Sequence, residues 1–269
     1  GGFGAMSYAA RHPDLFAAAA SFSGAVDTNN PLDIAVTPAA VWGSRATEEI
    51  LWRAHNPWDL AGNLRGLSLT IRTGNGLAGG PYGPSTGMDI VEYAVHQMSV
   101  SFHDRLTELG IPSIWDDYGP GGHLWPYWQR DLRQTLPTLM SVFAHPRPSP
   151  SSFTFKAAEP RYGVYGWSAA FSRRVMEFTT LRVDGRRSFS VTGSGRAVVT
   201  TAADWSPGRA VLVVIRDARG RQTRRVLVGG SRRLVVRLSL GPSNRYQEYT
   251  PQAATDRWVT ARVTIEAAR

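Results

Sequence analysis

The sequence predicts two regions of different fold class: an α/β region built on a parallel sheet, and an all-β region after it. Three observations predict this division. Helical stretches alternate with short apolar runs up to residue 144, residues 145–152 are rich in proline and serine, and residues 153–269 carry short runs of alternating polarity. With 42% hydrophobic and 10% aromatic residues, the chain has the composition of a packed protein.

The first region, residues 1–144, has the rhythm of a parallel sheet with flanking helices. An alanine-rich helix is predicted from Gly4 to His12, and Pro13 ends it. Apolar runs predict buried strands over 16–24, 67–74 and 114–118, with a helix between the last two. Strands that alternate with helices are typical of βαβ units.

The second region begins after a predicted linker, residues 145–152, which holds three prolines and three serines. Turn pairs such as Asp184-Gly185 and Pro207-Gly208 then separate β-branched runs. About eight strands and no clear helix are expected over 153–269, which is the pattern of a β-sandwich. The runs that the sequence marks as strands are 175–180, 188–192, 197–201, 211–215, 234–238 and 258–265.

Charge divides unevenly between the two regions. Residues 1–150 hold 9 arginines and 13 acidic residues, a net −4, whereas residues 151–269 hold 21 basic and 8 acidic residues, a net +13. A basic β domain of this kind can bind an anionic polymer such as cell-wall material, and solubility alone is the other interpretation. Nucleic acid is not expected as a partner, because no stacking aromatics are interleaved with the arginines of Arg232–Leu238.

Several classes of protein are not expected. Cysteine is absent, which excludes disulfides and thiolate zinc sites. No run approaches eighteen uncharged apolar residues, so a transmembrane segment is not predicted. No metal site and no cofactor are expected either. Gly2-Phe3-Gly4 is not read as a dinucleotide fingerprint, because it lacks the preceding strand and the later acidic residue of that motif.

The glycine-rich start, Gly1-Gly2-Phe3-Gly4, fits the second half of a nucleophile elbow, G-x-S-x-G, in which a serine sits on a tight turn between a strand and a helix. With Gly1 as the final glycine, the serine is expected two residues before Gly1. The chain is therefore expected to be the C-terminal part of a longer protein and to lack the nucleophile.

A complete G-x-S-x-G also occurs, at Gly83-Pro84-Ser85-Thr86-Gly87. The elbow needs a strand directly before the serine, whereas this match lies in a glycine-rich loop. Glycine-rich loops produce such matches by chance, so Ser85 stands as an alternative nucleophile but is not the expected one.

A catalytic histidine is expected on a loop after the last core strand. His123 has this placement, because it follows the 114–118 run through Gly119-Pro120-Gly121-Gly122. The other histidines lie in helical, turn or linker contexts, where surface or capping roles are expected: His12, His55, His96, His103 and His145.

Residues 1–143 resemble the esterase D group of α/β-hydrolases and, within it, the antigen 85 mycolyltransferases and related actinobacterial esterases. The order and spacing of several short segments carry the resemblance. These segments are Gly1–Met6, Ser21–Gly24, Val41–Gly43, Asn56-Pro57 after Trp52-Arg53, Gly74–Gly76, Glu92 ten residues before Phe102, and His123–Trp128.

The resemblance implies a C-terminal half of an α/β-hydrolase fold in which His123 is the general base and acid and Glu92 orients it. It also places Trp125 at a substrate-binding position. Without it, an acid directly after Gly74-Asn75-Gly76 would be preferred, but the first carboxylate after that loop is Asp89, the nearest rival to Glu92. Trp42 and the residues Tyr127 and Trp128 are expected to pack in the core, with sugar contact as the alternative for the last two.

The function implied is that of a serine esterase or acyltransferase acting on a small-molecule or glycolipid acyl ester through a Ser-Glu-His set. Secretion or cell-wall association is implied too, with any signal peptide upstream. The basic β domain is absent from the compact mycolyltransferases, which favours a general exported esterase. The alternative is a non-catalytic cell-wall or carbohydrate-binding protein that acts through the basic β domain.

Overall fold

The computed structural model describes residues 1–36 and 40–268, and only the backbone of residues 34–36. The described chain forms two compact units. The first consists of Gly1–Trp42 and His55–Pro148, and the second of Gly43–Ala54 and the residues from Ser149 onward.

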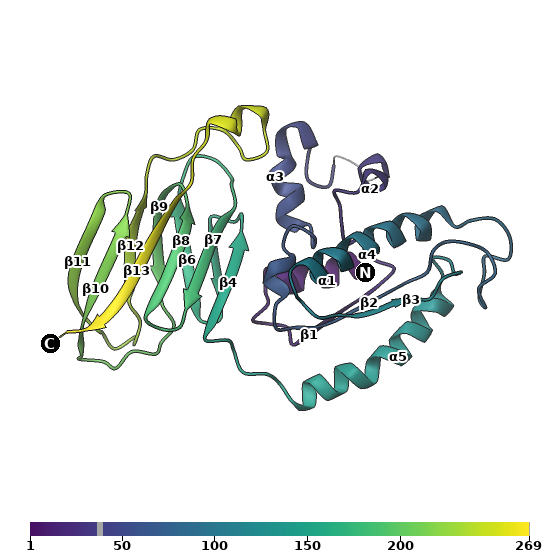
Figure 1. Cartoon of the computed structure of the whole chain (residues 1–269), viewed down its shortest axis with the longest axis horizontal. Helices are drawn as coiled ribbons and strands as arrows, with labels where there is room; N and C mark the ends of the chain where they lie inside the picture. Colours follow the sequence, from purple (N-terminus) through teal and green to yellow (C-terminus); the bar gives the residue numbers. More distant parts are fainter. Residues whose placement is uncertain (37–39, 269) are drawn as a thin grey trace. The chain divides into compact units, whose positions relative to one another are not determined.

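The first unit is a three-layer arrangement around a parallel sheet in the order β1-β2-β3. Pairing aligns Ala18 with Ser68 and Thr70 with Ile114. Helices α1 and α4 cover one face of this sheet, and α5 covers the other (Figure 1). Its elements are α1 (Gly2–Arg11), β1 (Ala18–Phe22), α2 (Pro31–Val36), η1 (Ala61–Leu64), β2 (Ser68–Thr73), α4 (Ile90–Glu108), β3 (Ile114–Asp117) and α5 (Trp125–Ala144).

The mixed α/β class predicted for this region is confirmed, and its three predicted strands lie within two residues of β1, β2 and β3 at each end. Burial of the apolar side chains of the central strand, β2, explains why apolar runs in the sequence predicted these strands. Leu69 and Ile71 of β2 are buried, together with Met6 of α1 and Phe102 of α4. Burying such side chains contributes about 1.5–3 kcal/mol each, which outweighs weak local preferences.

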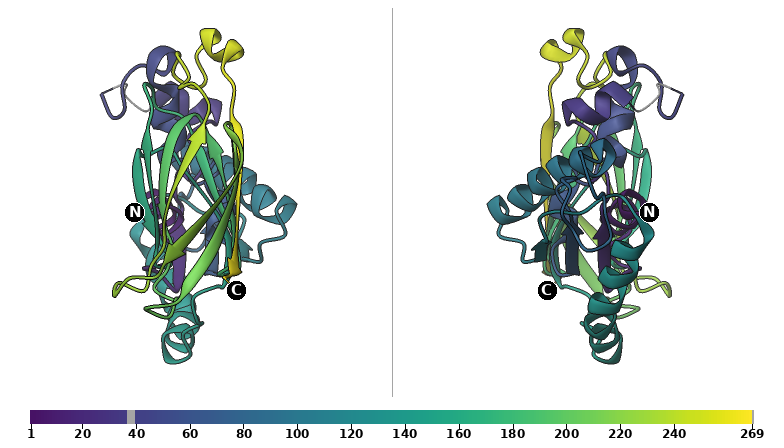
Figure 2. Two further views of the ribbon diagram at one scale, coloured as in Figure 1. Left: turned by 90° about the vertical axis from the view of Figure 1, so that its left-hand side faces the viewer. Right: turned by 90° about the vertical axis from the view of Figure 1, so that its right-hand side faces the viewer.

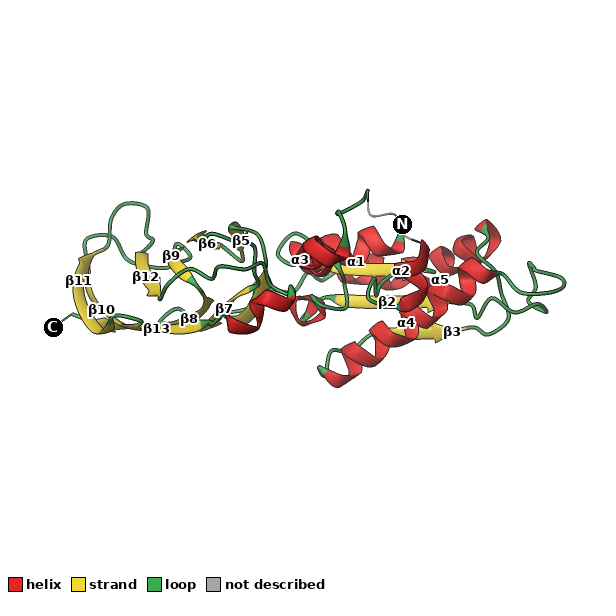
Figure 3. Ribbon diagram, turned by 90° about the horizontal axis from the view of Figure 1, so that it is seen from above, coloured by secondary structure: helices red, strands yellow, loops and turns green. Residues whose placement is uncertain are grey.

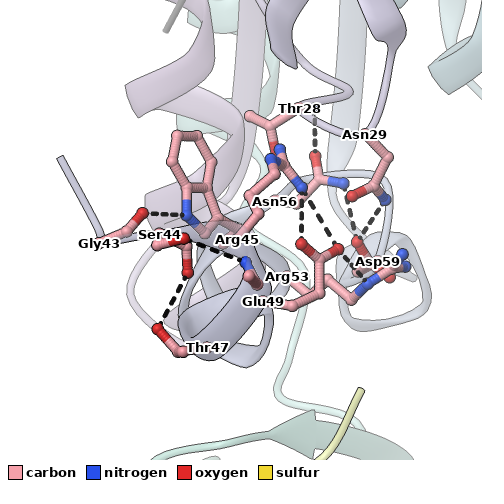
Figure 4. Close-up of polar contacts among 12 residues, drawn as sticks. Thr28, Asn29, Gly43, Ser44, Arg45, Thr47, Glu49, Arg53, Asn56 and Asp59 are labelled. Carbon is pink, nitrogen blue, oxygen red and sulfur yellow. Dashed lines mark hydrogen bonds and ion pairs between the residues drawn. The ribbon is translucent and has the colours of Figure 1, made fainter. Parts of the chain in front are cut away.

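The landmark Asn56 has a structural role in this unit. Its side-chain oxygen accepts a hydrogen bond from the backbone N–H of Thr28 (2.9 Å), and its amide nitrogen donates to Asp59 (2.8 Å). Asp59 also accepts a hydrogen bond from Asn29 (2.9 Å), as Figure 4 shows. Asn56 is fully buried, so these bonds replace the water that it loses on folding.

The described residues of the second unit form ten antiparallel strands. These strands make up two sheets (Figures 1 and 2). The larger sheet has the order β11-β10-β13-β8-β7-β4, and the smaller has the order β12-β9-β6-β5. The strands are β4 (Ser152–Ala157), β5 (Arg161–Val164), β6 (Trp167–Ser172), β7 (Thr179–Asp184), β8 (Ser188–Gly193), β9 (Gly195–Thr200), β10 (Ala210–Asp217), β11 (Gly220–Leu227), β12 (Val235–Leu240) and β13 (Val259–Ala267).

One hydrophobic cluster joins the two sheets. It includes Leu181 and Val191 from the larger sheet and Val199 and Trp167 from the smaller. The sheets lie as two separate layers in Figure 3. Buried and exposed residues alternate along β7, β12 and β13, which is what a sheet with one core face and one solvent face requires.

The strand predicted over 175–180 is wrong, because β7 begins only at Thr179. The cause is the buried carboxylate of Glu177. It accepts hydrogen bonds from the backbone and hydroxyl of Ser194 (2.9 and 2.8 Å) and from the amide of Asn244 (2.7 Å). These long-range bonds hold the preceding residues as a loop.

Strands β4, β5, β6 and β11 were not among the predicted strands. Strand β11 has no readable alternation, since most of its residues are exposed and it lies at the edge of its sheet. The second unit also contains two short helices, α3 (Arg45–His55, whose last residue falls in the first unit) and η2 (Pro251–Thr255). The loop before η2 holds α3 in place through Gln247, which donates to Thr47 and Glu48 at 2.9 Å.

Four arginines form a row across the outward face of the larger sheet. Arg216 of β10 lies directly opposite Arg221 of β11 and Arg262 of β13. The row continues through Ser190 of β8 to Arg182 of β7. Like charges at directly opposed positions destabilise a sheet, so Arg216 lies between two unfavourable neighbours.

We predict that Arg216→Thr raises the free energy of unfolding by roughly 0.5 kcal/mol at low salt, because two repulsive cross-strand pairs disappear. Urea denaturation measures this change. Arg237→Thr is the matched control, since Arg237 is also exposed on a strand but its paired neighbour is Val198. An equal gain in the control would mean that threonine's strand preference, rather than repulsion, causes the effect.

Candidate active site

The site lies at the edge of the parallel sheet where its strands end, the usual place for ligand sites in sheets of this type. Ser23 follows β1, Thr73 is the last residue of β2, and Gly74 follows it. Ser23 has a positive φ of 50°, which is uncommon for a residue other than glycine. Its backbone N–H donates to the backbone oxygen of Arg72 in β2 (2.9 Å), which fixes this turn against the neighbouring strand.

Glu92 lies in the first turn of α4 and is fully buried. Its Oε1 accepts hydrogen bonds from the Ser23 hydroxyl (2.8 Å) and the Gly74 backbone N–H (2.7 Å). The Thr73 hydroxyl lies 3.3 Å from the same oxygen. A buried carboxylate is stable only when paired and hydrogen-bonded, and these donors from two strand ends meet that condition.

The second carboxylate oxygen of Glu92 faces the imidazole of His123, with Oε2 and Nδ1 2.9 Å apart. The His123 side chain is 31% exposed, so its ring contacts both the buried carboxylate and solvent. Trp128 packs edge-on against the ring, with centroids 4.8 Å apart. This arrangement holds Nδ1 toward the carboxylate and leaves Nε2 for another partner.

Asp89, the rival acid, contacts the backbone of His123 rather than its ring. It is the N-cap of α4 and accepts a hydrogen bond from the N–H of Glu92 (3.1 Å). Its other oxygen accepts one from the N–H of His123 (2.7 Å). Partial burial opposes ionisation, but these backbone hydrogen bonds and the nearby imidazole outweigh it and lower the pKa of Asp89.

Glycines allow the loops around the pair to approach closely. A Cβ on Gly74 would lie 2.7 Å from the Tyr118 ring, and one on Gly76 would lie 2.5 Å from the backbone oxygen of Asp89. The N–H of Gly76 also donates to the backbone oxygen of Gly121 (3.0 Å) in the histidine loop. The loop after β2 therefore holds both the cap of α4 and the loop that carries His123.

The start of α1 shows a similar close approach. A Cβ on Gly2 would lie 2.8 Å from Cα of Gly24, and one on Gly24 would lie equally close to Cα of Gly2. Gly1 is the N-cap of α1, and its carbonyl accepts the N–H of Ala5 (3.0 Å). The Ser21 hydroxyl would lie closer still to either Cβ. The end of β1 and the beginning of α1 thus leave no room for a side chain at Gly2 or Gly24.

The aromatic residues that follow His123 differ in their exposure to solvent. Trp125 is 72% exposed and packs edge-on against Trp128. Tyr127 is fully buried, and its hydroxyl donates to the backbone oxygen of Gly83 (2.9 Å), so it packs in the core as expected. Trp42 packs against Phe3 and His55.

Ser85 lies in an exposed loop, with no strand directly before it and no helix directly after it. His96, another predicted bystander, pairs with Asp117 (2.8 Å) at the end of β3. Among the described residues, no group of three or more histidines and carboxylates is arranged to hold a metal ion. None of the described helices has the length and apolar character that crossing a bilayer requires.

Comparison with known proteins identifies the family. The model of the family described as "Putative esterase" matches residues 1–139, just over half of the chain. The chain belongs to this esterase family. The resemblance to esterases of the antigen 85 type is confirmed.

A curated relative of the esterase chain is diacylglycerol acyltransferase/mycolyltransferase Ag85B of Mycobacterium leprae (strain TN). The two are 26% identical over 159 residues, which cover 54% of this chain and 49% of that protein. The chain therefore spans about half the length of the curated relative it matches.

Two solved structures are also similar to this esterase-family chain. A ferulic acid esterase has 24% sequence identity and a TM-score of 0.36, with 53% of this chain and 48% of that chain covered. MPT51 (FbpC1) of Mycobacterium tuberculosis has 22% identity and a TM-score of 0.41, with 52% and 56% covered.

Sequence reasoning missed three groups around the pair. Ser23 and Thr73 were not recognised as donors to Glu92, although Ser23 lies in a segment that carries the family resemblance. Tyr118 was also missed. Its hydroxyl is buried, and burial, followed by the carboxylates of Glu92 and Asp131, raises its pKa.

We predict that Asp89→Ala lowers the free energy of unfolding by about 1 kcal/mol at pH 7, because it removes the cap of α4 and the bond to the His123 backbone. The folded-state pKa of Asp89 lies below its unfolded value, so this contribution is present above roughly pH 4 and is lost as pH falls further. Denaturant titrations from pH 7 to pH 2 measure it. Asp104→Ala, on an exposed position of the same helix, is the control. A deficit that grows as pH falls would contradict the assignment.

Proposed function

We propose that the first unit carries the acid–base part of a serine active site that acts on acyl esters, as a hydrolase or an acyltransferase. The observation that supports this most is the pair of a buried carboxylate, Glu92, and a part-exposed imidazole, His123, at 2.9 Å. Membership of the esterase family supports the ester as the substrate class. In this proposal His123 is the general base and acid, and Glu92 orients it.

The chemistry follows from the orientation of the ring. With Nδ1–H donating to Glu92, Nε2 carries a lone pair and can take the proton of a serine hydroxyl as its oxygen attacks the acyl carbonyl. Glu92 stabilises the imidazolium that forms. The tetrahedral intermediate collapses when Nε2 gives that proton to the leaving alcohol, which leaves an acyl-enzyme. Water or a second alcohol then gives its proton to Nε2 as its oxygen attacks the acyl-enzyme. Nε2 returns the proton to the serine, which leaves as the acid or the new ester is released.

The nucleophile in this proposal is a serine two residues before Gly1, on the turn that leads into α1. The close contact of Gly2 with Gly24 and with the Ser21 hydroxyl supports it, because the helix of a nucleophile elbow begins so close to the neighbouring strand that small residues are needed there. The N–H of the residue after the serine would be one oxyanion donor. Ser85 lacks the strand–turn–helix context.

Trp125 is proposed as a substrate contact. It is an exposed aromatic ring next to Trp128, which in turn packs on His123. Exposed aromatic faces bind apolar chains and the faces of sugars, and a small-molecule or glycolipid acyl ester offers both. Its exposure also means that folding does not depend on it.

The finer architecture is proposed as well. The parallel sheet with helices on both faces supports the C-terminal half of an α/β-hydrolase fold in residues 1–144, and the shared core of the two antiparallel sheets supports a β-sandwich accessory domain in 153–269, joined by the linker 145–152. Secretion or cell-wall association is proposed from the family. A purely non-catalytic role is less well supported, because the second oxygen of the buried Glu92 carboxylate faces a part-exposed imidazole, which holding the strand ends together does not require.

We predict that the protein extended through the upstream serine hydrolyses p-nitrophenyl acetate, and that His123→Ala or Glu92→Gln lowers kcat by about 10⁴-fold. The first change removes the base, and the second removes the charge that orients it. His96→Ala is the matched control, because His96 forms another histidine–carboxylate pair in the same unit. The proposal would be contradicted if the His123→Ala variant kept full esterase activity, or if the Ser85→Ala variant lost it.

We predict that Trp125→Ala raises KM about tenfold or more for esters with long acyl or sugar groups and leaves kcat for p-nitrophenyl acetate unchanged, because only substrate binding is lost. Steady-state kinetics on short and long esters separate the two effects. The thermal midpoint should stay within error of the parent. A fall in kcat for the short ester would instead indicate that Trp125 supports His123 through Trp128.

A further inference from the structure

The outward face of the larger sheet in the second unit is a shallow, basic concavity of about 390 Å³. Its centre is the arginine row described above, which runs directly from strand to strand. Neighbouring strands lie about 4.8 Å apart, so the row from β11 to β7 extends over roughly 19 Å. The arginines that line the concavity are Arg182, Arg216, Arg221 and Arg262.

Most of this charge has no ionic partner among the residues that the structure describes. Arg182 pairs with Asp184 (3.0 Å). For Arg216, Arg221 and Arg262, no carboxylate in the described chain lies within ion-pair distance. All three side chains are exposed, so they do not contribute to the packing of the hydrophobic core. A row of unpaired guanidinium groups that repel one another is stabilised by an anionic ligand.

Hydroxyl groups accompany the arginines on the same face. Thr192 and Thr260 lie opposite each other and share a hydrogen bond of 2.8 Å, and Ser190 lies between Arg262 and Arg182. The residues that alternate with the buried positions of β7, β8, β10, β11 and β13 include no aromatic side chain. The carboxylates that line the concavity are those of Asp184, which pairs with Arg182, and Glu266. The face thus offers mainly guanidinium and hydroxyl groups but no ring on which a base could stack.

A second basic concavity adjoins the first. It has a volume of about 490 Å³ and shares Glu266 with the first. Arg186 lies over the ring of Trp205 there, with 5.8 Å to the centroid. The basic residues that line it are Arg186, Arg187, Arg209 and Arg225. The basic surface is therefore longer than a small anion requires.

We propose that this face binds an extended acidic polysaccharide. The guanidinium groups of the row would pair with its carboxylates, because the planar fork of arginine matches a carboxylate with two parallel hydrogen bonds. The serine and threonine hydroxyls would bind sugar hydroxyls between the charges. Nucleic acid is the less suitable polyanion, since the strands present no aromatic side chain on this face and the ring of Trp205 in the second concavity is buried beneath Arg186. This inference is independent of the proposed catalysis.

The test measures binding of the full 269-residue chain to polygalacturonate by isothermal titration calorimetry at increasing salt. Binding is expected to be saturable and to weaken as salt rises. The triple variant Arg216→Gln/Arg221→Gln/Arg262→Gln should bind at least about tenfold more weakly, because three charge-assisted contacts are lost.

The matched control is Arg161→Gln/Arg196→Gln/Arg237→Gln. These three arginines are exposed on the smaller sheet, so the variant has the same net charge but keeps the row. It should bind polygalacturonate within about twofold of the parent, because long-range charge effects are screened at moderate salt. Equal losses in both triple variants would overturn the proposal, since net charge alone would then explain binding.

Three further ligands test which chemical groups of the polysaccharide the face recognises. Neutral dextran should not bind. Poly-L-glutamate, which has carboxylates without sugar hydroxyls, should bind more weakly than polygalacturonate, and equal affinity would overturn the assignment to a polysaccharide. Single-stranded oligo(dT) should also bind more weakly, and tighter binding would show that the face is a nucleic-acid site. Circular dichroism of each variant confirms that the strands remain folded.

Discussion

The burial of the Glu92 carboxylate is the constraint on which the geometry of the first unit depends. A charge removed from water costs several kcal/mol unless hydrogen bonds compensate for it. Here the compensation comes from the Ser23 hydroxyl, the Gly74 backbone and the His123 ring, which lie at or beyond the ends of different strands. The three strands must therefore end at the same edge before the carboxylate is stable. The proposed site and the sheet support each other.

Close backbone contacts restrict the positions that Glu92 and His123 can take. Gly74 and Gly76 lie so close to the histidine loop and to the cap of α4 that an added Cβ would overlap their neighbours. Asp89 then fixes the N–H groups of both Glu92 and His123, without touching the ring. Backbone hydrogen bonds on both sides thus hold the Glu92 carboxylate and the His123 imidazole at a fixed distance. Proton transfer requires such precise placement of the two groups.

The second unit uses a buried carboxylate in the same way. Glu177 accepts bonds from Ser194 and Asn244, which are far from it in sequence, and so fixes where β7 begins. The sheets then place apolar residues inward and arginines outward. Because pairing in a sheet aligns residues of neighbouring strands, arginines such as Arg216 and Arg262 that are scattered in the sequence become a continuous row.

The sequence by itself determined the features that depend on local periodicity and turn chemistry. Apolar runs located β1, β2 and β3, and the glycine loop after 114–118 marked His123. Glu92 was assigned only through the family resemblance, because one carboxylate on a helix carries no local signal. The tertiary structure alone decided that Ser23, 69 residues away, donates to Glu92, and that Arg216 lies between two other arginines. Hydrogen bonds across the fold and strand register depend on how distant segments pair, and periodicity does not encode that pairing.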